Sequence, residues 1–213
     1  MESAADYLPK KLSLTSLRTA AAGCHGCDLY KYATQTVFGE GRARARLLLV
    51  GEQPGDSEDR AGRPFVGPAG RILHQGLEAA GIAPRDIYVT NAVKHFKFVE
   101  RGKRRIHNKP KTIEIRACKP WLQAELEVVR PELIVALGAT AAQSLLGSTF
   151  RLLINRGRVI AQPGLRAPVV PTIHPSAVLR APDSETRHAE MRKFIADLRI
   201  AAKALATGLP PAA

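Results

Sequence analysis

The sequence predicts an α/β protein in which helices cover both faces of a central four-stranded parallel sheet, forming a three-layer α/β/α sandwich. Four short apolar runs, each bounded by turn-forming residues, have the character of buried parallel strands. They cover residues 46–50, 86–91, 132–138 and 168–174. Helical stretches alternate with these runs, as expected for strands joined by crossover helices. The chain has 213 residues, and we expect one domain over 1–213.

Three of the expected helices are followed by a glycine or a proline, residues that end helices. These ranges, each with the residue that follows it, are 68–80 (Gly81), 112–130 (Pro131) and 139–146 (Gly147). A shorter helix before Cys24 is expected to turn Leu14, Leu17 and Ala21 inward.

The final helix has the clearest sequence pattern. It begins at an Asp183–Ser184 cap, and its apolar residues recur at helical spacing, which is typical of a face buried in a core. These residues are Met191, Phe194, Ile195, Leu198, Ala202 and Leu205. The tail from about residue 207 is expected to be frayed.

The chain carries a large positive charge, formally +13, from 32 basic and 19 acidic residues. Such an excess favours a polyanionic partner such as a phosphate backbone, although composition alone also fits a merely soluble basic protein. The charge is concentrated in one connection, 92–111, which is longer than the loops of compact domains. Within it, residues 94–111 hold eight basic residues and one acidic residue, which favours nucleic-acid contact over a solvated segment.

The sequence also bears on the cellular compartment. The longest apolar run, 133–142, is too short to span a bilayer, and the first 17 residues lack the apolar core of a secretory signal. Three cysteines, an odd number with two close together, argue against a disulfide framework. We therefore expect a protein of the cytoplasm with no membrane partner. We also expect it to be a monomer.

Polar residues or glycines follow all four predicted strands. The segment Gly51-Glu-Gln-Pro-Gly-Asp56 follows the first strand, while Asn91, Gly138 and His174 stand at the ends of the others. The carboxyl edge of an open α/β sheet is where ligands bind. The first segment is neither a P-loop nor a dinucleotide fingerprint, and read alone it is a tight turn with incidental acids. The convergence of four strand ends favours a functional site.

The cysteines suggest a metal or cluster site. The spacing Cys24-His-Gly-Cys27 lets two thiolates reach one metal or cluster, and Cys118 is a candidate third ligand. His25 and His95 are the candidates for a fourth, although His25 is constrained by its neighbours. Cys118 also fits a buried core thiol, because it shares a helical face with apolar residues. Spacing does not separate zinc from an iron–sulfur cluster.

These segments resemble the motifs of family 4 uracil-DNA glycosylases, in matching order over about residues 24–198. Three departures from the usual family pattern resemble the UdgX branch: Gln53, His95 and the inserted 103–107 segment Lys-Arg-Arg-Ile-His. The motifs that carry the resemblance are Gly51-Glu-Gln-Pro-Gly-Asp56, Glu58-Asp-Arg-Ala-Gly-Arg-Pro-Phe-Val-Gly67, Thr90-Asn-Ala-Val-Lys94 and His174-Pro-Ser176.

The resemblance implies a uracil-DNA glycosylase-like fold and a DNA-repair hydrolase that excises uracil from single- or double-stranded DNA. It also implies a [4Fe–4S] cluster, with zinc not excluded by the sequence. The implied ligands are Cys24, Cys27, His95 and Cys118. We expect the cluster to have a structural role, because it would tie the N-terminal segment and the basic loop to one helix.

The resemblance also assigns the residues around a flipped uracil. It implies that Phe65 stacks on the base, that the Asn91 amide reads N3 and O4, and that His174 donates to O2. Phe65 also fits a core aromatic, but its neighbours predict an exposed turn, and His174 also fits a strand-end cap. Gln53 and Asp56 complete the implied substrate-binding set.

In the UdgX branch the resemblance implies that His107 attacks C1′ and leaves the protein attached to the abasic site, with Glu52 holding the imidazole. Arg105 is expected to fix the loop or grip a phosphate. The remaining expected DNA contacts are Lys94, Ser176 and Arg180. The alternatives are a multi-turnover glycosylase whose loop only grips DNA, and a non-catalytic DNA-binding module bearing a cluster or zinc.

Overall fold

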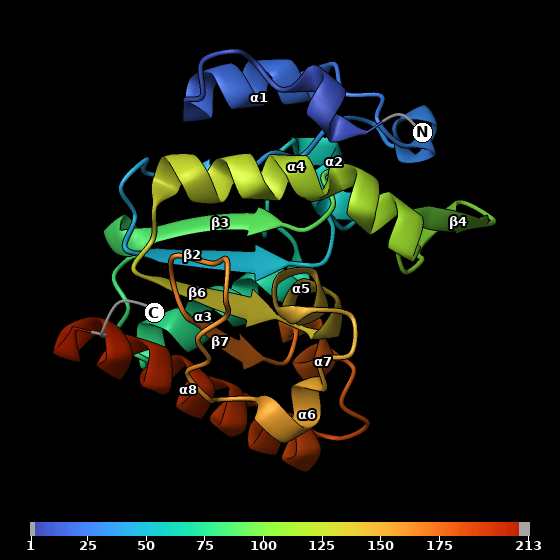
Figure 1. The fold of residues 1–213 in the computed structure, drawn as a ribbon. Helices are drawn as coiled ribbons and strands as arrows, with labels where there is room; N and C mark the ends of the chain where they lie inside the picture. The colour runs from blue at the N-terminus through green and yellow to red at the C-terminus, as the bar shows by residue number, and fades with distance from the viewer. Residues whose placement is uncertain (1–2, 209–213) are drawn as a thin grey trace.

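The central sheet of the computed structural model, which describes residues 3–208, has five strands in the order β1-β3-β2-β6-β7 (Figure 1). The four predicted strands are confirmed, and each runs parallel to its neighbours among them. They are β2 (Leu47–Gly51), β3 (Ile87–Asn91), β6 (Leu133–Leu137) and β7 (Val169–Thr172). The two-residue β1 (Glu40–Gly41) adds an antiparallel edge. It was not predicted, because two residues are too few to show the alternation of apolar and polar residues that marks a strand.

The predicted helices are confirmed, and the three that were predicted with both bounds agree to within one residue at each end. They are α1 (Leu14–Ala22), α3 (Pro68–Ala79), α4 (Thr112–Val129), α5 (Ala139–Leu146) and α8 (Ser184–Thr207). As predicted, Asp183 caps α8, accepting a hydrogen bond from Thr186 N–H at 2.7 Å. Most of the tail expected to be frayed, residues 209–213, lies outside the described residues.

Several short helical turns were not predicted, because none is long enough to show apolar residues recurring at helical spacing. The α-helical ones are α2 (Asp56–Ala61), α6 (Leu152–Asn155) and α7 (Pro175–Leu179). The 3-10 turns are η1 (Ala4–Tyr7), η2 (Asp28–Lys31) and η3 (Pro84–Asp86). Two of them matter for the site, because α2 and α7 are the first helices that follow β2 and β7 along the chain. Among the described residues, no helix has the length and apolar character needed to cross a membrane.

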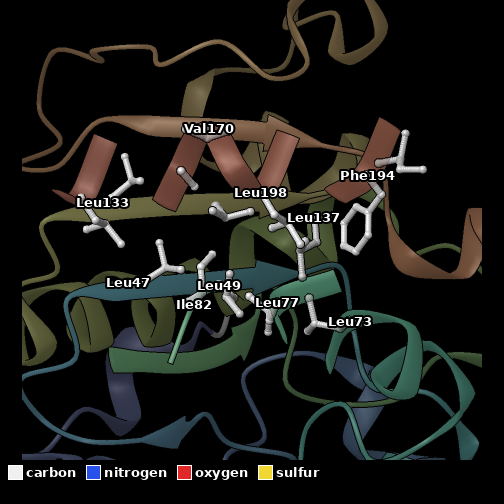
Figure 2. Packing of buried hydrophobic residues seen from close by; sticks show 14 of the residues in the cluster. Leu47, Leu49, Leu73, Leu77, Ile82, Leu133, Leu137, Val170, Phe194 and Leu198 are labelled. Carbon is white, nitrogen blue, oxygen red and sulfur yellow. The ribbon is translucent and has the colours of Figure 1, made fainter. Parts of the chain in front are cut away.

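The core lies on both faces of the sheet, because successive strand residues point to opposite sides. Leu47 and Leu49 of β2 pack in the layer formed with α3 and α8 (Figure 2). Leu48 and Val50 pack in the other layer, with α4 and α5. The predicted three-layer arrangement is therefore correct, and every residue of β2 is buried. These two layers fix the strand ends from which the site is built.

The basic connection 92–111 has secondary structure that the sequence did not predict. It contains a two-stranded antiparallel hairpin, β4 (Phe98–Arg101) and β5 (Arg104–His107), which lies beyond the end of α4 in Figure 1. The turn is possible because Gly102 takes a left-handed φ of 57°. At the base, Asn108 N–H donates to Lys97 O at 3.0 Å, so the two ends of the segment meet.

Candidate active site

Gly51 and Asn91 form the floor of a site at the carboxyl edge of the sheet, where they are partners in the β2–β3 ladder. A Cβ on Gly51 would lie 2.2 Å from Asn91 Oδ1 and 2.7 Å from Phe65 Cζ. Only glycine therefore allows the amide and the ring to approach this strand end. Asn91 Oδ1 is buried and has no hydrogen-bond partner among the described residues. Since an unpaired buried acceptor costs about 1–3 kcal/mol, its placement fits a ligand that donates to it.

Phe65 lies in a turn, as expected, but the expectation that this turn is exposed was wrong. Its side chain is 6% exposed and belongs to the core cluster shared with α3 and α8. Its φ of 54° is in the left-handed region, which non-glycine residues rarely adopt. Gly70 allows this path, because a Cβ there would lie 1.7 Å from Phe65 O. The sequence pattern predicted the turn, but it did not predict that the Phe65 side chain packs into the core.

The Glu58 carboxylate holds the two ends of the segment that contains Phe65. It accepts hydrogen bonds from Gly55 N–H at 3.0 Å and from Gly67 N–H at 2.7 Å. Glu58 is itself buried. The ring of Phe65 is thereby directed toward His174, with ring centroids 6.1 Å apart.

His174 follows β7 and is the N-cap of α7. Its Nδ1 accepts from Ser176 N–H at 3.2 Å and lies 2.7 Å from Ser176 Oγ, so the neutral ring carries its proton on Nε2. Burial lowers the pKa of His174 to about 4, outweighing the opposite effect of the Glu52 carboxylate. The sequence left the protonation state open, and the structure favours a neutral ring that donates through Nε2.

Glu52 and His107 come together although they lie on different parts of the chain. His107 Nε2, at the end of β5, is 3.2 Å from Glu52 Oε1, directly after β2. The second carboxylate oxygen of Glu52 accepts a hydrogen bond from Thr140 Oγ1. Burial alone would raise the pKa of Glu52, but the hydrogen bonds from His107 and Thr140 outweigh it and lower the pKa. Glu52 is therefore a carboxylate that holds a half-exposed imidazole.

Thr140 was missed by the sequence analysis. It is buried in the first turn of α5, two residues after Gly138 at the end of β6. Thr140 could have been predicted from its place in the sequence, because the first turn after a parallel strand faces the edge where ligands bind. Asn91 and His174 lie at the same edge.

Gln53 was expected to bind substrate, and its contacts contradict this expectation. Its side chain is buried, and its Nε2 donates to Lys97 O and Asn108 O, each at 3.1 Å. Its Oε1 accepts from Lys97 N–H at 3.1 Å. The amide is thus occupied by the base of the hairpin, and Gln53 attaches the hairpin to the end of β2.

Asp56 and Arg105 form a second attachment of the hairpin. Arg105 Nε lies 2.5 Å from Asp56 Oδ1, and Arg105 Nη1 lies 2.7 Å from Asp59 Oδ2, which is fully buried. The carboxylate of Asp56 is paired with Arg105 and Arg60, and its expected role in substrate binding remains a prediction. For Arg105 the two expected alternatives were fixing the loop and gripping a phosphate. Its contacts support fixing the loop.

Lys94 was expected to contact DNA, and its burial contradicts this expectation. The side chain is 1% exposed, and Nζ lies 2.5 Å from the fully buried Glu125 carboxylate. An ammonium group in this position cannot reach a phosphate. The charge count of the basic connection was correct, but it could not distinguish a buried lysine from a surface one.

Ser176 and Arg180 remain at the surface beside His174. Arg180 Nη1 donates to Ser176 Oγ at 2.9 Å, and Arg180 is exposed. Both lie on α7 or directly after it, so they border the same edge of the sheet as the other site residues. Their expected contact with phosphate remains a prediction.

The three cysteines gather between the N-terminal segment and α4. Cys24 and Cys118 are buried in one cluster, with Cys27 packed against it. Trp121 Nε1 donates to Cys24 Sγ at 3.2 Å, and Lys94 N–H donates to Cys118 Sγ at 3.3 Å. Burial raises the pKa of Cys118 to about 12, so this thiol stays protonated unless a positive group approaches it.

His95 has the properties of a metal ligand. Thr36 Oγ1 donates to Ala21 O, so in its 2.9 Å contact with His95 Nε2 the imidazole is the donor. His95 Nδ1 then keeps its lone pair, and burial lowers the pKa of the ring to about 4, which keeps it neutral. Within residues 3–208, however, no three His, Cys, Asp or Glu side chains stand in the arrangement of a metal site. The donor types fit a cluster, with two N–H groups already directed at sulfur.

Comparison with known proteins agrees with this arrangement. Residues 38–199 match the Uracil DNA glycosylase superfamily. A type-4 uracil-DNA glycosylase of Thermotoga maritima is 40% identical over 77% of this chain and 82% of its own length. One of Pyrobaculum aerophilum is 35% identical over 80% and 87%, and a type-5 enzyme of that organism is 30% identical over 76% and 75%. With its strand-end residues gathered at one edge of an α/β sheet, the chain belongs to the uracil DNA glycosylase superfamily.

Proposed function

We propose that this protein excises uracil from DNA and that His107 then forms a covalent bond to the resulting abasic site. The observation that carries the proposal is the contact of His107 with Glu52, which places an imidazole from the hairpin at the sheet edge that holds Asn91 and His174. Membership of the superfamily and the names of the type-4 relatives support the uracil-excising part.

Recognition begins with a uracil flipped out of the stack, because a base inside a duplex is out of reach. Asn91 Oδ1, which has no partner among the described residues, accepts from uracil N3–H, and its Nδ2 donates to O4. Phe65 stacks on the base. Cytosine offers a lone pair at N3 and an amino group at C4, so the same amide orientation would repel it.

Cleavage breaks the bond between C1′ and N1, and the electron pair leaves with the uracil. Negative charge then develops on O2, where His174 Nε2–H donates a hydrogen bond. A neutral His174 fits this task. Burial lowers its pKa to about 4, so the ring is neutral at neutral pH, and the contacts of Nδ1 with Ser176 leave the remaining proton on Nε2. The sugar is left as an electron-poor centre at C1′.

Capture uses the lone pair of the His107 imidazole, which bonds to C1′. The ring becomes positively charged at that moment, and the Glu52 carboxylate 3.2 Å away stabilises the charge and accepts the ring proton. The departed uracil anion takes its proton from water. An imidazole bound through nitrogen to a sugar carbon is a poor leaving group, so the protein acts once.

We also propose that Cys24, Cys27, Cys118 and His95 hold a [4Fe–4S] cluster. The three thiols, the neutral imidazole and the N–H donors at sulfur support this set. The cluster would supply a cross-link between the N-terminal segment, the start of the basic connection and α4. Zinc binds the same kinds of donor, and iron and sulfide analysis of the purified protein decides between them.

The DNA is proposed to contact Ser176, Arg180 and the exposed tip of the hairpin, with the protein acting as a monomer. The tip carries Arg101, Lys103 and Arg104, all exposed. These cations lie on the segment that carries His107, so phosphate binding at the tip would bring the nucleophile to the sugar.

The decisive experiment is a denaturing gel of the protein incubated with single-stranded DNA that contains one uracil. A slower band of protein plus oligonucleotide is expected, with no such band for a thymine oligonucleotide or for His107→Ala. Release of free uracil is measured in the same samples. Absence of the band from the parent protein would rule out the adduct.

A multi-turnover glycosylase is the second candidate, and the type-4 names of the relatives favour it. It predicts that the parent releases many uracils per protein molecule at excess substrate and forms no stable band. The covalent proposal predicts a burst of about one uracil per protein molecule. Turnover kinetics at excess DNA therefore separate the two.

A further inference from the structure

We infer that Lys94 is a positioning residue for uracil recognition, which holds the strand end that carries Asn91. This inference rests on the proposed function, because it assumes that Asn91 reads the base. Lys94 Nζ donates to the backbone oxygen of Asn91 at 2.8 Å. The ammonium group therefore fixes the main chain of the residue whose side chain faces Gly51 and Phe65.

The ammonium group is in turn fixed by a buried polar network. Nζ lies 2.5 Å from Glu125 Oε2 of α4 and donates to Thr90 Oγ1 at 2.6 Å. The Glu125 carboxylate also accepts from Thr90 Oγ1 and from Tyr88 Oη, each at 2.9 Å. Each donor and acceptor of the network has a partner, so Nζ has one defined position.

The backbone of Lys94 is anchored separately. Its N–H donates to Cys118 Sγ at 3.3 Å, and its carbonyl accepts from Val37 N–H at 2.8 Å. The Nζ group also lies 5.5 Å from the centre of the Phe38 ring. Lys94 thus connects two parts of the molecule. Its backbone contacts the cysteine cluster, and its side chain contacts the strand end that carries Asn91.

Stability alone does not explain a charged pair at this depth. Lys94 and Glu125 are 1% and 0% exposed, and removing such ions from water costs about as much as their attraction returns. A neutral pair of similar size would fold as well. What the ammonium adds is a strong, directional donor at the Asn91 carbonyl. The pair therefore serves the geometry of the site.

The test compares two changes in the same network. The double variant Lys94→Met/Glu125→Gln removes the donor to Asn91 without leaving a lone buried charge, and the amide that replaces the Glu125 carboxylate still reaches Tyr88 and Thr90. The control, Tyr88→Phe, removes one hydrogen bond to Glu125 and leaves Lys94 on Asn91. Thermal unfolding, the dissociation constant of free uracil, and single-turnover excision are measured for each.

The double variant is expected to bind free uracil about tenfold more weakly or worse, the cost of one misplaced hydrogen bond. The loss is expected to appear in the DNA concentration needed for half-maximal excision as well as in the maximal rate. Tyr88→Phe is expected to lower the unfolding temperature but to bind uracil within about twofold of the parent. Equal losses in both variants would mean that the network is only structural.

A milder variant keeps the inference testable if the double variant does not fold. Thr90→Val removes one of the acceptors that fix Nζ while conserving shape, and about threefold weaker uracil binding is expected. A folded variant that binds uracil as the parent does would overturn the inference. A parent that neither binds nor releases uracil would instead overturn the proposed function.

Discussion

The strand-end cluster (Asn91, His174, Glu52 and Phe65) and the β4–β5 hairpin contribute to one site, but they are held in place by different means. In the strand-end cluster, Asn91 is the last residue of a sheet strand and His174 comes two residues after another, so the backbone hydrogen bonds of the sheet set where they stand. The hairpin pairs only with itself and joins no strand of the central sheet. It is attached by side chains, chiefly Gln53 at its base and Arg105 on β5.

In the proposed mechanism this difference separates two kinds of chemistry. Recognition and bond cleavage are assigned to the strand-end cluster, whose positions the sheet fixes. Capture of the sugar is assigned to His107, whose position depends on a few side-chain contacts. If this assignment is right, changes in the strand-end cluster should affect excision and capture together, whereas changes in the hairpin attachments should affect capture alone.

The largest effect is expected for His174→Ala. Loss of a donor at the developing negative charge reduces the rate of excision by about 10²–10³-fold, and adduct formation falls with it. Single-turnover uracil release and the adduct gel measure the two rates on the same DNA. If adduct yield fell while uracil release stayed normal, the assignment of His174 to the leaving base would be wrong.

The hairpin attachment provides the next prediction. Arg105→Leu removes the pairing with Asp56 and the buried Asp59, and a nucleophile displaced by about 1 Å loses up to about 10²-fold in rate. Adduct formation should slow by that order while uracil release changes by less than about threefold. Arg60→Leu, which removes the other guanidinium from Asp56 and leaves Arg105 paired, is the matched control. Equal slowing of both reactions would show that the hairpin also takes part in excision.

The lowered pKa of His174 predicts a dependence of stability on pH. The folded-state pKa of His174 is about 4 against 6.5 for a free histidine, so between these values only the unfolded chain binds the proton. Its contribution to stability is complete above pH 6.5 and is lost as the pH falls toward 4, by roughly 2 kcal/mol for a partly buried ring. Denaturant unfolding should show the free energy of unfolding of the parent falling, relative to that of His174→Gln, as the pH is lowered from 6.5 toward 4. A difference between the two proteins that does not change with pH would mean that the folded protein binds the proton as readily as the unfolded chain.

The smallest effect is expected at the hairpin tip. Neutralising Lys103 and Arg104 together should weaken DNA binding by about tenfold or less at low salt and reduce the salt dependence by about one unit of slope per lost phosphate contact. Fluorescence anisotropy over a range of salt concentrations measures both. An unchanged slope would place the DNA elsewhere on the surface.

The sequence predicted the sheet and its long helices well, because buried strands and amphipathic helices leave periodic patterns. It did not predict the hairpin, whose strands are short and mostly exposed, with an apolar pattern interrupted by arginines. The gathering of polar strand-end residues such as Asn91 and His174 at one edge of the sheet was also predicted. The hydrogen-bond partners of the individual side chains were not predicted, as Gln53 and Lys94 show.

The predicted roles of Gln53 and Lys94 were wrong for the same physical reason. Gln53 and Lys94 are polar and close in sequence to the site, so their composition suggests contact with substrate or DNA. In the fold both are buried, and their hydrogen-bonding groups serve the protein's own backbone. Burial of a polar side chain depends on partners distant in the chain, such as Asn108 and Glu125, and no local pattern encodes them.

The closure at the base of the hairpin has one further consequence. Lys97 and Asn108 are joined by a hydrogen bond of 3.0 Å, so the ten residues between them leave and rejoin the fold at a single point. Such a segment is a module: shortening it to a tight turn would leave the path of the remaining chain unchanged, and its two ends need neighbouring backbone positions in a recipient protein. To be held as it is here, it also needs carboxylates like those of Asp56 and Asp59 for Arg105, and an amide like that of Gln53 beneath its base. A related scaffold that offers these contacts would acquire the proposed nucleophile without any change to its sheet.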